Sequence, residues 1–373
     1  MTPTQPQILL TEEQLHAVDL ITQWLKSGSR QEFRLGGYAG TGKTTIQKTI
    51  RENLDILGTR SVVGAFTGKA CNVLQRKGLF DASTIHSMIY DCEVQKNGTF
   101  EFFLRSRLEG NPKLIIIDEA SMISTELYRD LRSFNIPILF VGDPGQLEPV
   151  GDNPNLMSRP DFVLSKIHRQ AETSPIIRFA SEIRRGVIPK EQKEEGLHVR
   201  SKVGFDIPLA ATFDQVICAK NKTRVDINRR FRRYLDKPID KLQPEDKIIV
   251  LRNNMSFGVF NGMILFVDLI LERTELYTKL DAHDEIGRKF SNLLVWNEPF
   301  TKDLPKEFVI PKVNRQQLVY CDWGYCITCH KSQGSEWEKV LLWDEWMPPT
   351  IWDMRRWRYT GITRASKELT HCL

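Results

Sequence analysis

Apolar residues recur along this chain at helical spacing in some segments and in short continuous runs in others. Residues 10–25 carry apolar side chains at positions 15, 18, 21, 24 and 25 behind Thr11, an N-cap candidate, and predict an amphipathic helix. Continuous apolar runs at 61–66, 113–117 and 137–141 predict buried strands. Because these runs alternate with helical segments, the pattern predicts an α/β fold with a parallel sheet and crossover helices.

A second series of strand and helix patterns begins near residue 164. Residues 259–318 differ from the rest of this series, because their short β-rich runs are separated by charged loops, and they predict a small β subdomain inserted into a second α/β domain. The other elements of the series are helices at 175–185 and 222–234 and strands at 215–219, 247–251 and 339–343.

Residues 93–103 alternate between apolar and polar side chains on both sides of Asn97-Gly98. An Asn-Gly pair favours a two-residue turn in which both central residues adopt positive φ. The segment therefore predicts a β-hairpin that protrudes from the first domain.

Size and composition indicate a globular protein of two or more domains. The chain has 373 residues, of which 41% are hydrophobic and 27% charged. Its formal net charge of +5 permits a polyanionic partner without demanding one. No apolar run approaches the roughly 20 residues that span a bilayer, and residues 1–7 lack the layout of a signal peptide, so we expect a cytosolic protein that binds no membrane. Seven cysteines, an odd number, favour reduced thiols over a disulfide framework.

Residues 37–44 fit the phosphate-binding pattern G-x-x-x-x-G-K-[ST]. Its glycines let successive backbone N–H groups converge on phosphate oxygens. Lys43 supplies positive charge, Thr44 offers a hydroxyl to Mg²⁺, and a helix predicted from residue 45 points its positive end at the same anion. A strand predicted at 32–35 precedes the loop, which argues against the alternative of a glycine-rich turn with an ordinary lysine. We assign to nucleotide binding Gly37, Gly40, Thr41, Gly42, Lys43, Thr44 and Thr45.

Two later strands end in polar residues that suit the same chemistry. Asp118 follows the run 113–117 and can hold Mg²⁺ against the phosphates, while Glu119 can polarise the water that attacks the γ-phosphorus. A helix N-cap is the alternative explanation of two acids at a strand end. After the run 137–141, turn formation leaves Asp143 and Gln146 unexplained, and a glutamine there can report whether the γ-phosphate is present.

Two further features leave alternatives open. The spacing Cys321-x₄-Cys326-x₂-Cys329 matches plant-type iron–sulfur ligands, but a strand would send Cys326 and Cys329 to opposite faces and no second cysteine pair accompanies them. We therefore expect no metal cluster there.

Five arginines fall on the predicted helix between residues 224 and 233, where a solvated face and a nucleic-acid contact both account for them.

Nine further or extended motifs occur in order along residues 10–369. They are Gln14 in Thr11-Glu-Glu-Gln-Leu15, residues 37–44, Phe66-Thr-Gly-Lys-Ala70, Ser83-Thr-Ile-His86, Asp118-Glu-Ala-Ser121, Gly142-Asp-Pro-Gly-Gln146, His168-Arg-Gln170, residues 328–336 and residues 359–365. Together they resemble the motifs of superfamily 1 helicases, of the RecD/Dda-like, 5′ to 3′ branch. The resemblance implies two RecA-like P-loop motor domains with parallel sheets, at 1–163 and at 164–258 with 319–373. It also implies a pin hairpin at 89–110 and a small SH3-like β subdomain at 259–318.

The resemblance also implies roles for individual residues, with ATP and Mg²⁺ as cofactors. Gln14 would read the adenine edge and Glu336 would hydrogen-bond the ribose. Arg169 and Arg364 would act as arginine fingers from the second domain, because a guanidinium spreads positive charge over the phosphoryl oxygens as the bond breaks. Catalysis would fall to Lys43, Glu119, Gln146, Arg169 and Arg364, with Thr44 and Asp118 on the metal. Nucleic-acid contacts would come from Thr67, Lys69, Thr84, His86, Phe100, Phe102, Asn254, Thr328, His330 and Lys331.

The implied function is ATP-driven 5′ to 3′ movement on single-stranded DNA with unwinding of duplex. We expect a monomer that binds single strands and junctions and works with replication or recombination proteins in the cytoplasm of a bacterial or phage-infected cell. A motor on RNA, or a DNA translocase that does not unwind, is the nearest alternative, because no residue reads the 2′-hydroxyl. A metabolic P-loop kinase would need no second arginine-bearing domain, and a non-catalytic ATP-gated binding module would not need the intact catalytic set.

Overall fold

The structure is a computed structural model that describes residues 10–56, 58–94, 100–148, 152–167, 173–302, 304–305, 307–348 and 353–373. The chain divides into two units. The first comprises Met1–Phe66, Cys71–Ile89 and Arg105–Ser174, and the second comprises Thr67–Ala70, Tyr90–Leu104 and Pro175–Leu373.

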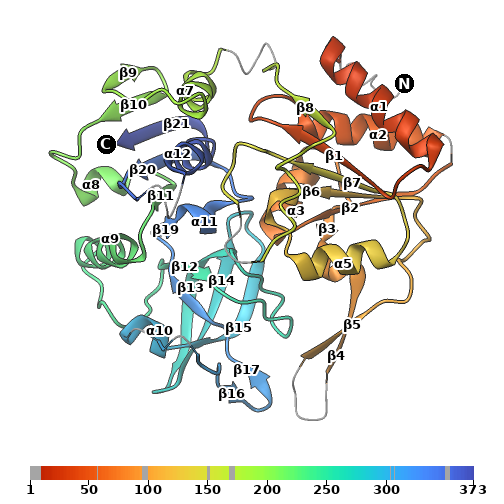
Figure 1. The fold of residues 1–373 in the computed structure, drawn as a ribbon. Helices are drawn as coiled ribbons and strands as arrows, with labels where there is room; N and C mark the ends of the chain where they lie inside the picture. The colour runs from red at the N-terminus through yellow and green to blue at the C-terminus, as the bar shows by residue number, and fades with distance from the viewer. Residues whose placement is uncertain are drawn as a thin grey trace, which may run out of the picture. The chain divides into compact units, whose positions relative to one another are not determined.

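The first unit is built on a six-stranded parallel sheet with the order β3-β2-β6-β7-β1-β8 (Figure 1). The runs predicted at 61–66, 113–117 and 137–141 all form strands of this sheet, each within one residue of its predicted bounds. The central strands are buried because helices cover both faces of such a sheet. The strands are β1 (Glu32–Gly37), β2 (Ser61–Ala65), β3 (Ser83–Thr84), β6 (Leu114–Asp118), β7 (Ile138–Gly142) and β8 (Phe162–Leu164), and the helices are α1 (Glu12–Ser27), α2 (Lys43–Ile56), α3 (Gly68–Arg76), α4 (Ile85–Ile89), the 3₁₀ turn η1 (Ala120–Met122) and α5 (Thr125–Ser133).

The predicted N-cap of α1 is confirmed, and it forms a capping box. The Thr11 hydroxyl accepts a hydrogen bond from the Gln14 backbone N–H, and the Gln14 side chain accepts one from the Thr11 N–H (2.9 Å). The helix buries Ile21 and Trp24, whereas Leu15, which the periodicity places on the apolar face, is 51% exposed.

The first unit extends beyond the domain boundary predicted at residue 163. Strand β8 pairs with β1, and the Glu13 carboxylate accepts hydrogen bonds from the backbone N–H groups of Ser165 (3.1 Å) and Lys166 (2.9 Å). These bonds hold residues 165 and 166 against helix α1, and the first unit extends to Ser174.

The second unit holds a six-stranded sheet with the order β19-β11-β20-β21-β10-β9, in which every pair is parallel except β9 with β10. This second sheet confirms the repeated α/β architecture. Its strands are β9 (Gln192–Glu194), β10 (Leu197–Arg200), β11 (Gln215–Cys218), β19 (Cys326–Thr328), β20 (Trp337–Trp343) and β21 (Ala365–Cys372), and its helices are α7 (Pro175–Arg184), α8 (Ile207–Ala210), α9 (Asn221–Tyr234), α11 (Cys329–Ser332) and α12 (Met354–Ile362).

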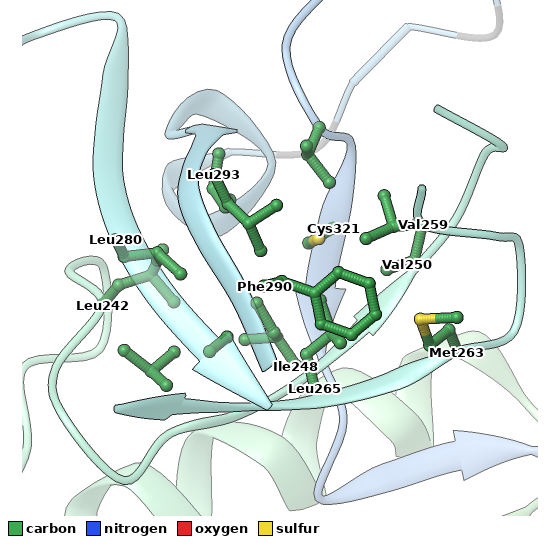
Figure 2. Close-up of a cluster of buried hydrophobic side chains, with 14 of the residues drawn as sticks. Leu242, Ile248, Val250, Val259, Met263, Leu265, Leu280, Phe290, Leu293 and Cys321 are labelled. Atoms are coloured by element: carbon green, nitrogen blue, oxygen red, sulfur yellow. The ribbon is translucent and has the colours of Figure 1, made fainter. Parts of the chain in front are cut away.

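An antiparallel five-stranded sheet, with the order β15-β14-β13-β12-β18, forms the inserted β subdomain. Figure 2 shows Ile248, Leu265, Phe290 and Cys321 among the side chains of its buried core. The strands are β12 (Lys247–Val250), β13 (Ile264–Arg273), β14 (Tyr277–Asp284), β15 (Lys289–Trp296) and β18 (Cys321–Trp323), accompanied by α10 (Glu298–Thr301) and the short pair β16 (Lys312–Val313) and β17 (Gln316–Gln317).

The subdomain is therefore wider than the predicted range 259–318. The run 247–251 was assigned to the second motor domain, but β12 pairs with β13 and β18 of the antiparallel sheet. A short apolar run fits the centre of either kind of sheet, and its own residues do not reveal its pairing partners.

The predicted hairpin is present as β4 (Tyr90–Val94) paired antiparallel with β5 (Phe100–Leu104), with Tyr90 opposite Leu104. Its predicted assignment to the first domain is wrong, because Tyr90–Leu104 belong to the second unit. The Asn97-Gly98 turn lies outside the described residues. In the described ranges, no helix combines the length and the apolarity that crossing a bilayer would take.

Candidate nucleotide-binding site

The predicted phosphate loop connects β1, which ends at Gly37, to α2, which begins at Lys43. Gly40 (φ 77°) and Gly42 (φ 83°) adopt left-handed backbone angles that favour glycine. A Cβ atom on Gly42 would lie 2.2 Å from the Gln14 Nε2 atom, so this glycine also makes room for a side chain of helix α1. The loop thereby leads directly into the N-terminus of α2, whose positive end favours a bound anion.

Side chains of the loop bind the loop's own carbonyl oxygens. The Lys43 Nζ atom donates to the carbonyl oxygens of Gly37 (2.7 Å) and Tyr38 (3.3 Å), and it lies 3.9 Å from Asp143 Oδ2. The Thr41 hydroxyl donates to the Tyr38 carbonyl (2.8 Å). An incoming phosphate can draw the Lys43 ammonium from these neutral acceptors, because a charged acceptor makes the stronger hydrogen bond.

Gln14 connects helix α1 to this loop. Its Nε2 donates to the Thr41 carbonyl (3.1 Å), its Oε1 accepts from the Thr11 N–H, and the residue is buried. These two bonds use one of the two amide N–H groups and one of the two carbonyl lone pairs. Recognition of adenine by Gln14 stays a prediction. In the structure, the Gln14 side chain connects helix α1 to the phosphate loop through its hydrogen bond to the Thr41 carbonyl.

The acid pair lies at the end of β6, as predicted. Asp118 is the last residue of the strand, and its Oδ1 accepts a hydrogen bond from the Gln47 Nε2 atom (2.7 Å). Burial raises the pKa of the Asp118 carboxyl above its ordinary value, while the Lys43 charge and the Gln47 hydrogen bond act in the opposite direction. Glu119 follows with φ 52° and ψ 41°, a left-handed conformation that is uncommon for a residue with a side chain.

The third strand end brings Asp143 and Gln146 to the same edge of the sheet. Asp143 follows β7 and is buried, and its Oδ1 accepts from the Gly145 N–H (2.8 Å). The Gln146 N–H donates to the Asp143 carbonyl (3.2 Å), and Gln146 is also buried. The carboxyl ends of parallel strands meet at one edge, where such sheets bind their ligands. The structure therefore gathers the loop of Lys43, the acid pair and the Asp143 turn into one candidate site.

Of the predicted arginine fingers, Arg364 is described and Arg169 lies outside the described residues. The Arg364 guanidinium is buried and donates three hydrogen bonds within the second unit, to the carbonyls of Thr360 (3.0 Å) and Ser335 (3.0 Å) and to the Thr363 hydroxyl (3.1 Å). Glu336, predicted to bind the ribose, is exposed.

Two of the predicted nucleic-acid residues in the N-terminal half, Thr67 and Thr84, cap helices. The Thr67 hydroxyl accepts from the Ala70 N–H (3.1 Å) at the start of α3, which also carries Lys69. The Thr84 hydroxyl accepts from the Ser87 N–H (3.2 Å) at the start of α4, and burial lowers the pKa of His86 on the same helix.

In the second unit, Lys331 is the predicted contact best suited to a phosphate. Its Nζ donates to Asn261 Oδ1 (3.0 Å), and within the described ranges it forms no ion pair. Burial, followed by the nearby Arg224 charge, lowers the pKa of Lys331, and burial alone lowers the pKa of His330. A half-buried cation with a neutral partner gains from an added anion. Thr328 lies at the N-cap of the same short helix, α11, without a side-chain capping bond.

Asn254 is less suited to the predicted contact. It is buried, and its Nδ2 donates to the Gln317 carbonyl (2.8 Å), which fastens the loop after β12 to β17. Its amide is therefore used inside the β subdomain.

Comparison with known proteins places this chain in a family. Residues 9–202, more than half of the chain, match the AAA domain family, and residues 324–370 match the UvrD-like helicase C-terminal domain. The chain belongs to the RecD/Dda-like superfamily 1B helicases. Two relatives carry helicase names. The chain is 27% identical to the ATP-dependent RecD2 DNA helicase of Deinococcus radiodurans over 396 residues, covering 95% of this chain and 48% of that protein.

It is also 31% identical to the ATP-dependent DNA helicase dda of Enterobacteria phage T4 over 208 residues, covering 52% of this chain and 47% of that protein. The chain thus spans about half the length of these relatives. Its fold is similar to that of the Bacteroides Pif1 helicase solved with ADP-AlF3 and ssDNA, with a TM-score of 0.56, 18% identity and coverage of 98% of this chain and 92% of that one. This likeness confirms the predicted architecture of two RecA-like domains for this superfamily 1B chain.

The hairpin phenylalanines and the three closely spaced cysteines were also singled out in the sequence. On the hairpin, Phe102 is 44% exposed, and the Phe100 side chain lies outside the described residues. Cys321, Cys326 and Cys329 are all buried, and burial raises the pKa of Cys329 to about 12. The described ranges contain no group of three or more His, Cys, Asp or Glu side chains that could hold a metal, so the iron–sulfur spacing has no such cluster around it there.

The arginine-rich helix α9 has both exposed and buried members. Arg232 is fully buried, forms an ion pair with buried Asp246 and lies 4.1 Å over the Trp323 ring, so a solvated face is wrong for this residue. Arg224 pairs with Asp322 (2.6 Å). Arg229 and Arg233 are exposed and remain open to either explanation.

Sequence reasoning missed Gln47, which contacts the acid pair. No local signal marks it, because a glutamine on an amphipathic helix is ordinary and its partner Asp118 is 71 residues away.

Proposed function

We propose that this chain is the motor of an ATP-dependent DNA helicase. One observation carries the proposal: the strand ends of the first sheet bring Lys43, Asp118 and Asp143 to a single edge in a superfamily 1B chain. A metabolic kinase, the alternative from another class, does not fit this family membership.

At the nucleotide, Lys43 and the loop N–H groups would bind the β- and γ-phosphates. Thr44 and Asp118 would hold Mg²⁺, which neutralises charge on the phosphates. The donor set fits, because a hydroxyl and a half-buried carboxylate are hard oxygen ligands and a cation would stabilise the ionised form of Asp118. Glu119 would polarise the attacking water and Gln146 would sense the γ-phosphate.

The remaining nucleotide contacts are proposed from the family motifs. Gln14 would bind adenine, Glu336 the ribose, and Arg169 and Arg364 would stabilise the transferring phosphoryl group. Arg364 would exchange some of its three internal hydrogen bonds for the phosphate, an exchange that a stronger, charge-assisted bond favours.

We propose single-stranded DNA, including its junctions with duplex, as the partner, because both named relatives are DNA helicases and the Pif1 structure was solved with ssDNA. Lys331, His330, Thr328 and Lys69 would contact the strand, and Phe102 on the hairpin would stack on a base at the junction. Movement would be 5′ to 3′ by a monomer that can work with replication or recombination proteins.

Strand displacement tests this function. Forked, 5′-tailed and 3′-tailed duplexes of DNA and of RNA are incubated with the protein, with and without ATP. We expect ATP-dependent displacement from forked and 5′-tailed DNA. Displacement confined to 3′-tailed DNA would overturn the polarity, activity confined to RNA would overturn the substrate, and ATP turnover without displacement would indicate a translocase.

A further inference from the structure

Gln47 is a fully buried polar residue next to the proposed cation site. It lies on α2, one helical turn after Lys43 and Thr44 and on the same face of the helix. Its Nε2 donates a 2.7 Å hydrogen bond to Asp118 Oδ1, and its Oε1 is buried and accepts no hydrogen bond from the described residues.

The orientation of this amide follows from its chemistry. A carboxylate is an acceptor only, so the NH₂ group must face Asp118, since the flipped amide would place two acceptors against each other. Burying a polar residue whose oxygen has no partner is unfavourable for folding. Packing alone therefore does not explain a glutamine at this position, because an apolar side chain of the same size would be more favourable for folding.

The effect on Asp118 is to fix one of its two oxygens. Asp118 ends β6, where the strand no longer restrains the next residues, and a charge-assisted bond to Oδ1 determines the direction of Oδ2. Partners that orient a metal-binding carboxylate typically change metal affinity by about 10- to 100-fold.

We propose that Gln47 is a positioning residue that sets the divalent-cation affinity of the nucleotide site by holding Asp118 in place. The inference rests on the proposed function, in which Asp118 is a Mg²⁺ ligand. It predicts that loss of the Gln47 amide changes the Mg²⁺ requirement of nucleotide binding and leaves the metal-free binding of the nucleotide intact.

The test measures binding of a fluorescent ADP analogue to the full chain, in EDTA and across a Mg²⁺ titration. Gln47→Met keeps side-chain volume and removes the donor. We expect the Mg²⁺ concentration for half-maximal tightening to rise about 10- to 100-fold, with affinity in EDTA within about twofold of the unaltered protein. In Gln47→Asn the amide is one methylene too short to reach Asp118, so this variant should also need a higher Mg²⁺ concentration. It replaces Gln47→Met in the test if that variant does not fold.

Gln75→Met is the matched control. Gln75 also lies on a helix of the N-terminal half, and its Nε2 donates to the Ala82 carbonyl (2.8 Å), away from the site. The Mg²⁺ requirement of Gln75→Met should not change. If it rose as much as that of Gln47→Met, general destabilisation would explain both results and the proposal would be overturned.

Asp118→Asn distinguishes a failure of the role proposed for Gln47 from a failure of the proposed cation site. If it removes the Mg²⁺ effect while Gln47→Met leaves the Mg²⁺ requirement unchanged, the role of Gln47 is wrong and the cation site stands. If Asp118→Asn also leaves the Mg²⁺ requirement unchanged, the proposed cation site itself is wrong.

Discussion

The left-handed backbone at Glu119 yields a prediction that separates stability from activity. Its φ of 52° and ψ of 41° lie near the ideal left-handed values, where an L-residue other than Gly, Asn or Asp is disfavoured by about 1–2 kcal/mol. Glycine avoids that cost but loses about 0.4–1 kcal/mol through its more flexible unfolded chain. Glu119→Gly should therefore be more stable than Glu119→Ala by roughly 0.5–1 kcal/mol.

The comparison of two variants is informative because both lose the Glu119 side chain and its contacts. Urea denaturation of the full chain, followed by far-ultraviolet circular dichroism, gives the difference in unfolding free energy. ATP hydrolysis by both variants should fall by about 10²- to 10⁴-fold, as expected when a general base is removed. A backbone with ordinary right-handed angles would reverse the order and make the alanine variant the more stable, and that result would refute the reasoning.

Three further predictions concern other parts of the molecule. Burial lowers the pKa of Lys247 from the ordinary value of 10.5 to about 8. Between these two pH values the unfolded chain binds more protons than the folded chain, so the free energy of unfolding rises with pH. This contribution of Lys247 is lost again as the pH falls through about 8. Relative to Lys247→Met, the unaltered chain should gain up to about 3 kcal/mol in unfolding free energy between pH 7 and pH 10.5; urea titrations at matched pH check this, and a constant difference would contradict it. Gly42→Ala should weaken nucleotide binding by about tenfold or more, because its Cβ would clash with Gln14 at φ 83°; a fluorescence titration with the nucleotide measures the loss, and an unchanged affinity would show that the loop tolerates the side chain. Arg232→Met should destabilise the chain by about 3 kcal/mol, because it leaves the Asp246 carboxylate buried without its main partner; a thermal melt unchanged from the unaltered protein would show that the pair contributes little.

The parts of the site that lie within one motif could be predicted from the sequence. Residues 37–44 carry their glycines, lysine and threonine side by side, and the local pattern alone fixes the strand before them and the helix after them. The apolar runs that end at Asp118 and Asp143 could be brought together because parallel strands share one carboxyl edge.

The parts that depend on distant pairing could not be predicted. The run at 247–250 is equally apolar in a parallel or an antiparallel sheet, so its place in the β subdomain follows only from its partners β13 and β18. Arg232 has the composition of a surface residue, and its burial depends on Asp246 and Trp323, which belong to other elements. The left-handed angle of Glu119 has no signal in a residue type that usually avoids it.

The central claim is that the Lys43 edge of the first sheet hydrolyses ATP in response to a nucleic-acid strand. The most direct measurement is steady-state ATP hydrolysis with and without a single-stranded oligodeoxynucleotide, for the unaltered chain and for Lys43→Ala. The account predicts that the strand accelerates turnover by the unaltered chain, and that Lys43→Ala lowers it by about 10²-fold or more while still binding the strand. Turnover that ignores the strand, or that survives in Lys43→Ala, would contradict the account.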